Sequence, residues 1–234
     1  MENEVLEQFS QWAATYDQEI VPIFGRMAKY GYFQFLTEIT HLVEHNPSGN
    51  SYILEAGLGT GSISLALLKT YPKCLIEGID ITESMLEQAQ KRINDSGEKS
   101  RINLKKASVE KIPFSDNTFD AAIFSLGLHH TQVKKSVKEL VRVLKDGGRL
   151  IIPDFAANPV WETLIGKTIY RIKMFFYELK MGEKAKAERD AILYSISEWK
   201  EILEGNGLNN INIEDITHNS NKWFPKILMI SALK

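Results

Sequence analysis

The chain has 234 residues, of which 44% are hydrophobic and 25% are charged, and its formal net charge at pH 7 is −2. These values exclude a disordered or fibrous protein and allow one well-cored domain with an elaboration. A charge this close to zero provides no overall field that would gather polyanions, so we expect no nucleic acid as a partner.

The single cysteine, Cys74, excludes an internal disulfide and a cysteine-built metal site, and we expect no metal. The first residues, MENEVLEQFSQW, lack the basic start and the apolar run of a secretion signal. No uncharged apolar stretch approaches the length of a membrane span. We therefore expect a cytoplasmic protein, a monomer or a homodimer, without stable membrane insertion.

Strand-like and helix-like patterns alternate along most of the chain. Helical patterns are found at residues 62–71, 84–94 and 134–145, and short apolar runs favour strands at 52–56, 75–80, 102–107, 119–127 and 149–155. Strands that alternate with helices of about 10 to 15 residues predict parallel pairing through right-handed crossovers. The pattern therefore predicts a doubly wound α/β sheet.

The end of the chain departs from this alternation. After a helical pattern at 197–207, two apolar segments follow at 210–217 and 226–234 with no helix between them. This spacing predicts an antiparallel pair that closes one edge of the sheet. The whole expectation is a seven-stranded, mostly parallel sheet with an antiparallel C-terminal edge.

Three glycines at alternate positions follow the first expected strand, in the stretch ILEAGLGTGSISLALL (53–68). A tight turn needs only one glycine, whereas a ligand that approaches the backbone closely needs positions without a Cβ. In doubly wound sheets, ligands bind beyond the C-terminal ends of the strands. Because Asp80 ends the next strand, the pattern favours a nucleotide-like ligand whose ribose Asp80 binds. Asp80 could also cap the following helix together with Thr82.

The spacing of the glycines separates two classes of adenosine ligand. A dinucleotide fold has the pattern G-x-G-x-x-G and would need glycine or alanine at the position of Ser62. The chain instead has E-x-G-x-G-x-G, from Glu55 to Gly61. This motif, with GIDITESMLEQA, KASVEKIPFSDNTFDAAIFSLGLHH and ELVRVLKDGGRLIIPDF, resembles the class I S-adenosylmethionine-dependent methyltransferases. The IPFSDNTFD stretch is similar to the broad family that includes the ubiquinone and menaquinone biosynthesis methyltransferases.

The resemblance implies a Rossmann-like methyltransferase fold with S-adenosylmethionine as the cofactor. It implies that the backbone at Gly57, Gly59 and Gly61 contacts the methionine part of the cofactor. Glu55 is then expected to organise the same loop, and Asp80 to accept hydrogen bonds from the two ribose hydroxyls.

The adenine end is where this chain departs from the family pattern. The resemblance places Ile81 against the adenine and Leu126 near the sulfonium. Many members have Asp and a small residue at the adenine edge, whereas this chain has Ser108 and Val109. The Ser108 hydroxyl can accept from the exocyclic amine and the Val109 amide can donate to a ring nitrogen, but the charge-assisted contact is lost.

Two histidines, His129 and His130, follow the fourth expected strand, on the face where the methyl group should emerge. A histidine near its ordinary pKa can deprotonate a phenol, enol or amine nucleophile. Such a pair also commonly caps backbone groups or lines a pocket without catalysis. We name both as candidate bases and favour His129, because it comes first after the strand end.

The N-terminal stretch FSQWAATYDQEIVPIFG lies outside the sheet pattern. Its aromatic residues are typical of a helical cap over the cofactor, and the resemblance implies that Tyr16 reaches the cofactor carboxylate. Alternatively, Trp12 and Tyr16, four residues apart, form an apolar helix face against the core.

A second helical pattern, at 156–196, has one strongly apolar face and one basic face. Its apolar residues are Trp161, Leu164, Ile165, Ile169, Ile172, Phe175, Phe176 and Leu179. A lid over a lipophilic or aromatic acceptor is the first interpretation, since a variable element at this position selects the substrate. Plain core packing comes second and a membrane-surface helix third.

Together these features predict one domain over residues 1–234. It comprises a cap at 1–48, a cofactor-binding core at 50–155, the lid at 156–196 and a C-terminal helix and strands at 197–234. The expected function is methylation of a small, hydrophobic or aromatic molecule at O, N or C. One alternative is methylation of tRNA or protein. Another is cofactor binding without catalysis, which the sequence does not separate from the first reading because methyl transfer requires no particular side chain.

Overall fold

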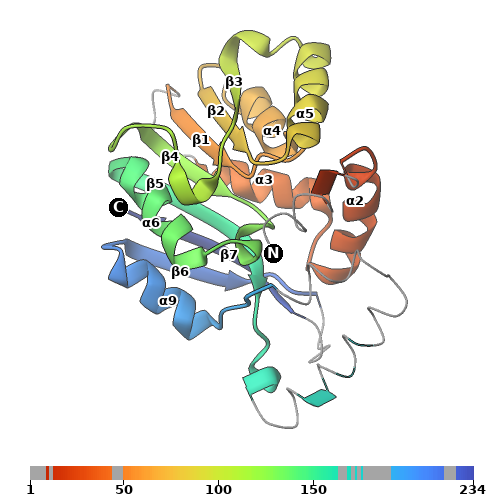
Figure 1. Cartoon of the computed structure of the whole chain (residues 1–234), viewed down its shortest axis with the longest axis vertical. Coiled ribbons are helices and arrows are strands. Elements are labelled where there is room, and N and C mark those ends of the chain that lie inside the picture. Colours follow the sequence, from red (N-terminus) through yellow and green to blue (C-terminus); the bar gives the residue numbers. More distant parts are fainter. Residues whose placement is uncertain are drawn as a thin grey trace.

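The fold is taken from a computed structural model, which describes residues 9–10, 13–43, 50–162, 168–169, 172, 175, 191–218 and 225–234. Its centre is a seven-stranded sheet in the order β3-β2-β1-β4-β5-β7-β6 (Figure 1). The strands are β1 (Tyr52–Ala56), β2 (Leu75–Asp80), β3 (Ile102–Lys106), β4 (Phe119–Phe124), β5 (Leu144–Ala156), β6 (Asn209–Asp215) and β7 (Lys226–Leu233). The predicted seven-stranded sheet is confirmed.

Strands β1 to β5 pair in parallel, and β7 is antiparallel to both of its neighbours, β5 and β6. The expected antiparallel pair at the C-terminal end is thus confirmed, with β6 outermost and β7 inserted beside β5. The strand order reverses between β1 and β4, which is where doubly wound sheets bind their ligands.

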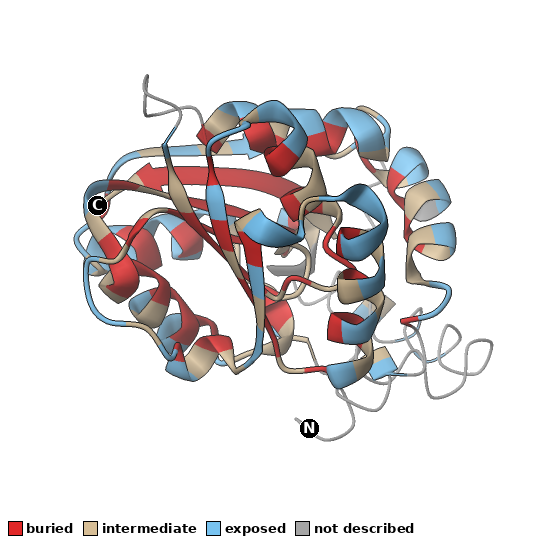
Figure 2. Ribbon diagram, turned by 90° about the horizontal axis from the view of Figure 1, so that it is seen from above, coloured by how far each residue is buried: buried red, intermediate tan, exposed pale blue. Residues whose placement is uncertain are grey.

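Helices cover both faces of the sheet, which lies buried between them (Figure 2). One face packs against α3 (Tyr32–Val43), α4 (Ser62–Thr70) and α5 (Glu83–Ser96), together with α2 (Tyr16–Met27). The other packs against α6 (Val133–Val143) and α9 (Ile196–Gly205). Four short 3-10 turns complete the described elements: η1 (Lys99–Arg101), η2 (Val109–Lys111), η3 (Leu128–His130) and η4 (Pro159–Glu162).

The junction of α6 and β5 differs from the expectation. The helix ends at Val143 and the strand begins at Leu144, five residues before the expected start. The pairing with β4 shifts register across the intervening KDGG stretch, where Gly147 has a φ of +75°. A Cβ on Gly148 would lie 2.7 Å from the carbonyl oxygen of Lys145, so this bulge requires glycine.

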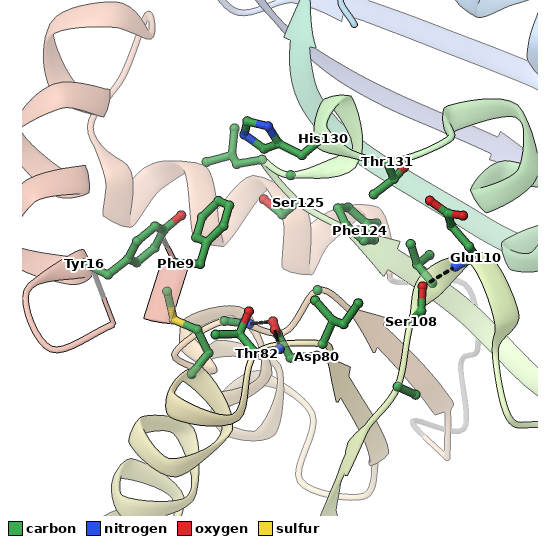
Figure 3. Close-up of a pocket in the computed structure, with 18 residues that line it drawn as sticks. Phe9, Tyr16, Asp80, Thr82, Ser108, Glu110, Phe124, Ser125, His130 and Thr131 are labelled. Atoms are coloured by element: carbon green, nitrogen blue, oxygen red, sulfur yellow. Dashed lines mark hydrogen bonds between the residues drawn. The ribbon is translucent and has the colours of Figure 1, made fainter. Parts of the chain in front are cut away.

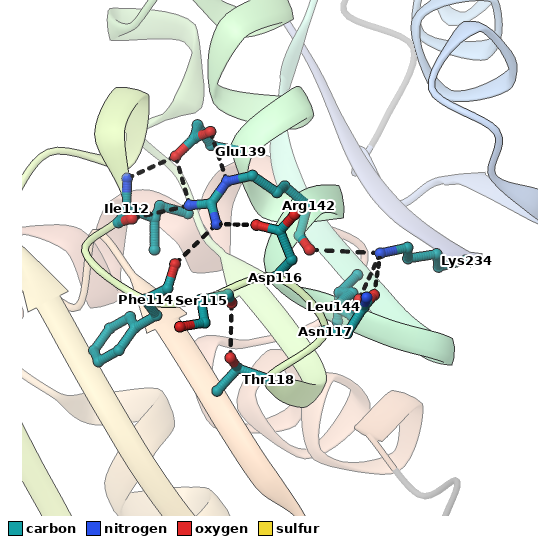
Figure 4. Close-up of polar contacts among 10 residues, drawn as sticks. All are labelled: Ile112, Phe114, Ser115, Asp116, Asn117, Thr118, Glu139, Arg142, Leu144 and Lys234. Atoms are coloured by element: carbon teal, nitrogen blue, oxygen red, sulfur yellow. Dashed lines mark hydrogen bonds and ion pairs between the residues drawn. The ribbon is translucent and has the colours of Figure 1, made fainter.

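Arg142, near the end of α6, holds the loop between η2 and β4 (Figure 4). Its guanidinium donates to the carbonyl oxygens of Ile112 and Phe114, at 2.9 and 2.8 Å, and forms ion pairs with Asp116 and Glu139. Glu139 in turn accepts a hydrogen bond from the backbone N–H of Ile112. Contacts with Arg142 and Glu139 within the fold therefore hold the IPFSDNTFD stretch in place.

The parallel register brings the ends of the central strands to one level. Ala56, the last residue of β1, is paired with Ile79 of β2 and Phe124 of β4. The residues that follow each strand therefore meet at the same edge of the sheet, above the reversal of strand order.

Candidate functional site

A pocket lies at this edge, and about 880 Å³ of it, part of which is open to solvent, is free of protein atoms. Figure 3 shows Asp80 and Thr82 in its middle, Ser108 and Glu110 at one end, and Phe9 and Tyr16 at the other. Nine of the residues expected from the sequence line it: Tyr16, Gly57, Gly59, Asp80, Ile81, Ser108, Val109, Leu126 and His130.

The three glycines of the first turn all have positive φ angles, and each meets different surroundings. A Cβ on Gly57 would lie 2.8 Å from the Phe124 ring, so a larger residue cannot fit there. A Cβ on Gly61, before α4, would lie 3.4 Å from that of Ala89 in α5. At Gly59, no described atom lies within 4 Å of an added Cβ. Gly59 therefore offers bare backbone to the pocket, as a close ligand requires.

Asp80 is 8% exposed, and both of its carboxylate oxygens bind the backbone. One accepts from the N–H of Gly59 and the other from that of Thr82, each at 2.8 Å. Asp80 thus connects the glycine turn to Thr82, the residue before α5, while it still lines the pocket. A carboxylate has further lone pairs for a ligand hydroxyl. Burial raises the pKa of Asp80, and the backbone hydrogen bonds from Thr82 and Gly59 oppose that rise.

Glu55 lies beneath the pocket and is not part of its lining. Its side chain is buried and accepts a hydrogen bond from the Ser64 hydroxyl of α4. Burial, with a smaller contribution from the nearby charge of Asp80, raises the pKa of Glu55 to about 8. Glu55 therefore connects β1 to α4, and at neutral pH its carboxyl is mostly protonated.

The stretch from Ala107 to Glu110 forms the end of the pocket beyond β3. The Ser108 hydroxyl accepts from the backbone N–H of Glu110 at 3.2 Å, which starts the short turn η2 (Figure 3). Glu110 itself accepts from the N–H of Gln132 and forms an ion pair with Lys135. One acceptor position of the Ser108 hydroxyl remains for a ligand amine.

Leu126 follows β4 with a φ of +54°, a conformation that residues with a side chain rarely adopt. Its backbone N–H donates to the carbonyl oxygen of Pro153 in β5, at 2.8 Å, which holds this conformation. Strained backbone of this kind costs of the order of 1 kcal/mol and is concentrated at functional sites. Leu126 is part of the pocket lining.

The two histidines have different surroundings. His129 is 3% exposed, lies outside the pocket lining, and its Nδ1 is 2.5 Å from Oδ1 of Asp154. Its backbone N–H also donates to Asp154, at 2.9 Å. His130 lines the pocket, where its ring packs edge-on against Phe9, with 5.6 Å between the ring centres (Figure 3). The residue in position to meet a ligand is therefore His130, not the favoured His129.

The N-terminal aromatic residues divide between pocket and core. Phe9 and Tyr16 line the pocket, as expected for a cap, whereas Phe24 is buried against Phe35 with 4.4 Å between the ring centres. Trp12 is outside the described residues.

Most of the expected lid at 156–196 also falls outside the described residues. Within its described part, Ile172 and Phe175 are 52% and 57% exposed, and neither belongs to the pocket lining. The lid therefore stays a prediction.

About half of the lining consists of residues that were not expected there from the sequence. These residues are Thr82, Met85, Ala107, Glu110, Phe124, Ser125, Gly127 and Thr131. Most of them lie next to a residue that was expected, or one helical turn from it, so the strand ends were the signal that could have found them.

No group of three or more His, Cys, Asp or Glu side chains that could hold a metal ion occurs within the described residues. In the same part of the chain, none of the helices has the length and apolar character needed to cross a bilayer.

Comparisons with known proteins show similarity to methyltransferases. Residues 54–152 match the model of a family described as a methyltransferase domain. The ubiquinone/menaquinone biosynthesis C-methyltransferase UbiE of Geobacter sp. (strain M21) is 36% identical over 121 residues, which cover 50% of this chain and 52% of that protein. The match thus spans about half the length of this relative. UbiE of Geotalea daltonii (strain DSM 22248 / JCM 15807 / FRC-32) is 29% identical over 189 residues, covering 75% and 77%.

A solved structure with a similar fold is geranyl diphosphate C-methyltransferase from Streptomyces coelicolor A3(2), in complex with Mg²⁺, geranyl diphosphate and S-adenosyl-L-homocysteine. The superposition has a TM-score of 0.69 and covers 86% of this chain and 78% of that one. Because the two sequences are only 14% identical, this likeness shows the fold alone.

Proposed function

The chain carries a class I S-adenosylmethionine-dependent methyltransferase domain, and on this premise we propose that it methylates a small hydrophobic or aromatic molecule. The observation that carries the proposal is the meeting of Gly59, Asp80 and Ser108 in one pocket, at the ends of three neighbouring strands. That arrangement suits an extended ligand with a backbone-contacting part, a ribose and a base.

We assign the cofactor contacts from one end of the pocket to the other. Tyr16 and the backbone of Gly57 and Gly59 bind the methionine part, Asp80 accepts from the ribose hydroxyls, and Ser108 lies at the adenine edge. Ile81 packs on the adenine, Val109 donates its amide to a ring nitrogen, and Leu126 lies near the sulfonium. The bare backbone at Gly59 supports the first of these contacts, since a bound group can approach there without meeting a Cβ.

S-adenosylmethionine supplies a methyl group on a good leaving group, so the protein has to align the acceptor and exclude water. Phe9 and His130, which touch across the pocket, are placed to do both. His130 is the candidate proton acceptor, and the buried pair of His129 and Asp154 fixes the turn η3 that carries it.

The acceptor class follows from the walls of the pocket. Phe9, Met85, Phe124 and Leu126 present apolar surface, so binding energy comes mainly from buried area. The name of the UbiE relatives points the same way, because it refers to quinones. Reduced quinones with short prenyl tails are the first acceptors to test.

Calorimetric titration with S-adenosylmethionine, S-adenosylhomocysteine and NAD tests the cofactor. We expect both sulfur compounds to bind and NAD not to bind. Transfer of label from S-adenosyl-[methyl-³H]methionine into a panel of reduced quinones and a metabolite extract then tests the reaction. Binding of NAD alone would reject the cofactor, and binding of the cofactor without any transfer would favour the non-catalytic alternative.

A further inference from the structure

The N-terminal cap and the glycine turn meet in a cluster of polar side chains behind the pocket. Asp17, in the first turn of α2, forms an ion pair with Arg92 of α5, with 2.5 Å between Nη1 and Oδ2. The other oxygen of Asp17 accepts from the Thr60 hydroxyl at 2.7 Å. Neither Asp17 nor Arg92 lines the pocket.

Arg92 also binds the glycine turn directly. Its Nη1 lies 3.0 Å from the Thr60 hydroxyl, 3.2 Å from the Thr60 carbonyl oxygen and 3.1 Å from the Ser62 hydroxyl. The cluster therefore ties α2 and α5 to the turn between β1 and α4.

The surroundings of Asp17 favour its negative charge. Asp17 lies at the N-terminus of its own helix and contacts Thr60, just before the N-terminus of α4, so two helix dipoles favour its negative charge. Asp17 and Arg92 are each more than a third exposed, and an isolated pair of that kind contributes little to stability. Thr60, however, is only 5% exposed and binds both partners, so loss of either one disturbs a buried hydroxyl.

Both ends of the cluster are adjacent to pocket residues. Asp17 follows Tyr16, and Thr60 follows Gly59. We propose that Arg92 and Asp17 are positioning residues that hold the Tyr16 wall against the Gly59 turn, so that cofactor affinity depends on two side chains outside the pocket. This inference rests on the proposed function.

The test compares Arg92→Ala with Lys91→Ala, which removes the same charge from an exposed neighbour on the same helix. Titration with S-adenosylhomocysteine should give a dissociation constant about tenfold higher for Arg92→Ala, and one within twofold of wild type for Lys91→Ala. Arg92→Lys should recover part of the affinity, because Nζ can still reach a carboxylate. Asp17→Asn, with nearly the same shape, should weaken binding in the same direction.

A double-mutant cycle separates positioning from general loss of stability. In a Tyr16→Phe background, removal of Arg92 should weaken binding less than in wild type, since the wall that Arg92 positions already lacks its hydroxyl. If Arg92→Ala and Asp17→Asn bind as tightly as wild type, or if Arg92 and Tyr16 act additively, the inference is wrong while the proposed function stands. If wild type binds no S-adenosylhomocysteine, the proposed function fails and the inference fails with it.

Discussion

Two stretches of this chain resemble the same methyltransferases but have different surroundings. The glycine turn at 57–61 leaves bare backbone facing the pocket at Gly59, next to the Asp80 carboxylate, which has further acceptor positions (Figure 3). In the stretch at 112–118, the carbonyls of Ile112 and Phe114 and the side chain of Asp116 are bound to Arg142 (Figure 4). The first stretch leaves space beside Gly59 and further acceptor positions on Asp80 for a ligand, whereas the second is held by contacts within the fold.

Glu55 is an exception to this comparison, because it belongs to the glycine motif but its side chain is buried and does not line the pocket. Its pKa of about 8 lies above the ordinary value of 4.5, so the stability that it contributes is complete below about pH 4.5 and is lost as the pH rises toward 8. Glu55→Gln keeps an acceptor for Ser64 without the charge. As the pH rises from 5 to 8, the free energy of unfolding of the variant should increase by about 3 kcal/mol relative to that of wild type.

Urea unfolding of both proteins at several pH values measures this gain. The affinity for S-adenosylhomocysteine should change little, because Glu55 is not part of the pocket lining. A wild-type protein whose stability does not fall relative to Glu55→Gln over this range would show that Glu55 ionises normally.

His130 sharpens the comparison on the pocket side. If it accepts a proton from the acceptor, His130→Ala should lower the rate of methyl transfer by about 100-fold at saturating cofactor, with little effect on cofactor affinity. The matched variant is His129→Gln, which loses the buried hydrogen bond between the imidazole ring and Asp154 and should lower the melting temperature instead. If the rate of methyl transfer falls less than threefold in His130→Ala, His130 only lines the pocket and does not accept the proton.

Asp80 has both roles at once, since it fastens the turn and faces the ligand. Asp80→Ala should weaken S-adenosylhomocysteine binding by roughly 30-fold or more, about 2 kcal/mol, because two hydrogen bonds to a charged acceptor are lost. It should also lower stability through the loss of the contacts to Gly59 and Thr82. Because the pKa of Asp80 is raised and the ribose binds its ionised form, wild-type affinity should increase with pH.

The control for Asp80 is Asp120, a carboxylate in β4 that also binds backbone, accepting from the N–H of Tyr52 at 2.8 Å. Asp120→Ala should lower stability without changing affinity. Equal affinities for the two variants would mean that Asp80 has no contact with the cofactor.

Arg142 holds the stretch at 112–118 in place, and its loss should leave the pocket intact. Arg142→Ala should lower the free energy of unfolding by about 1 to 2 kcal/mol, since charge-assisted hydrogen bonds to the loop are lost from a partly exposed side chain. Lys138→Ala, an exposed neighbour on the same helix, should be neutral. If folded Arg142→Ala binds the cofactor more weakly than wild type, the stretch at 112–118 contributes to the site and the comparison with the glycine turn fails.

The sequence predicts the sheet well because strand and helix periodicities are local properties. Asp80 was expected from its place at a strand end, and Ser108 and Leu126 from the resemblance to the family; all three line the pocket. The choice between His129 and His130 could not, because adjacent residues of a 3-10 turn point in different directions and Asp154 decides which one is buried. Arg92 was missed since it acts through Asp17, 75 residues away in the sequence.

The most direct test of the cofactor assignment is the affinity of S-adenosylhomocysteine for two glycine variants, Gly59→Ala and Gly97→Ala. Both glycines have positive φ angles and space for a Cβ, so both variants carry the same backbone strain. Only Gly59 faces the pocket, whereas Gly97 ends α5. We predict binding at least about tenfold weaker for Gly59→Ala and nearly unchanged for Gly97→Ala. Equal affinities of the two folded variants would contradict the placement of the cofactor against the glycine turn.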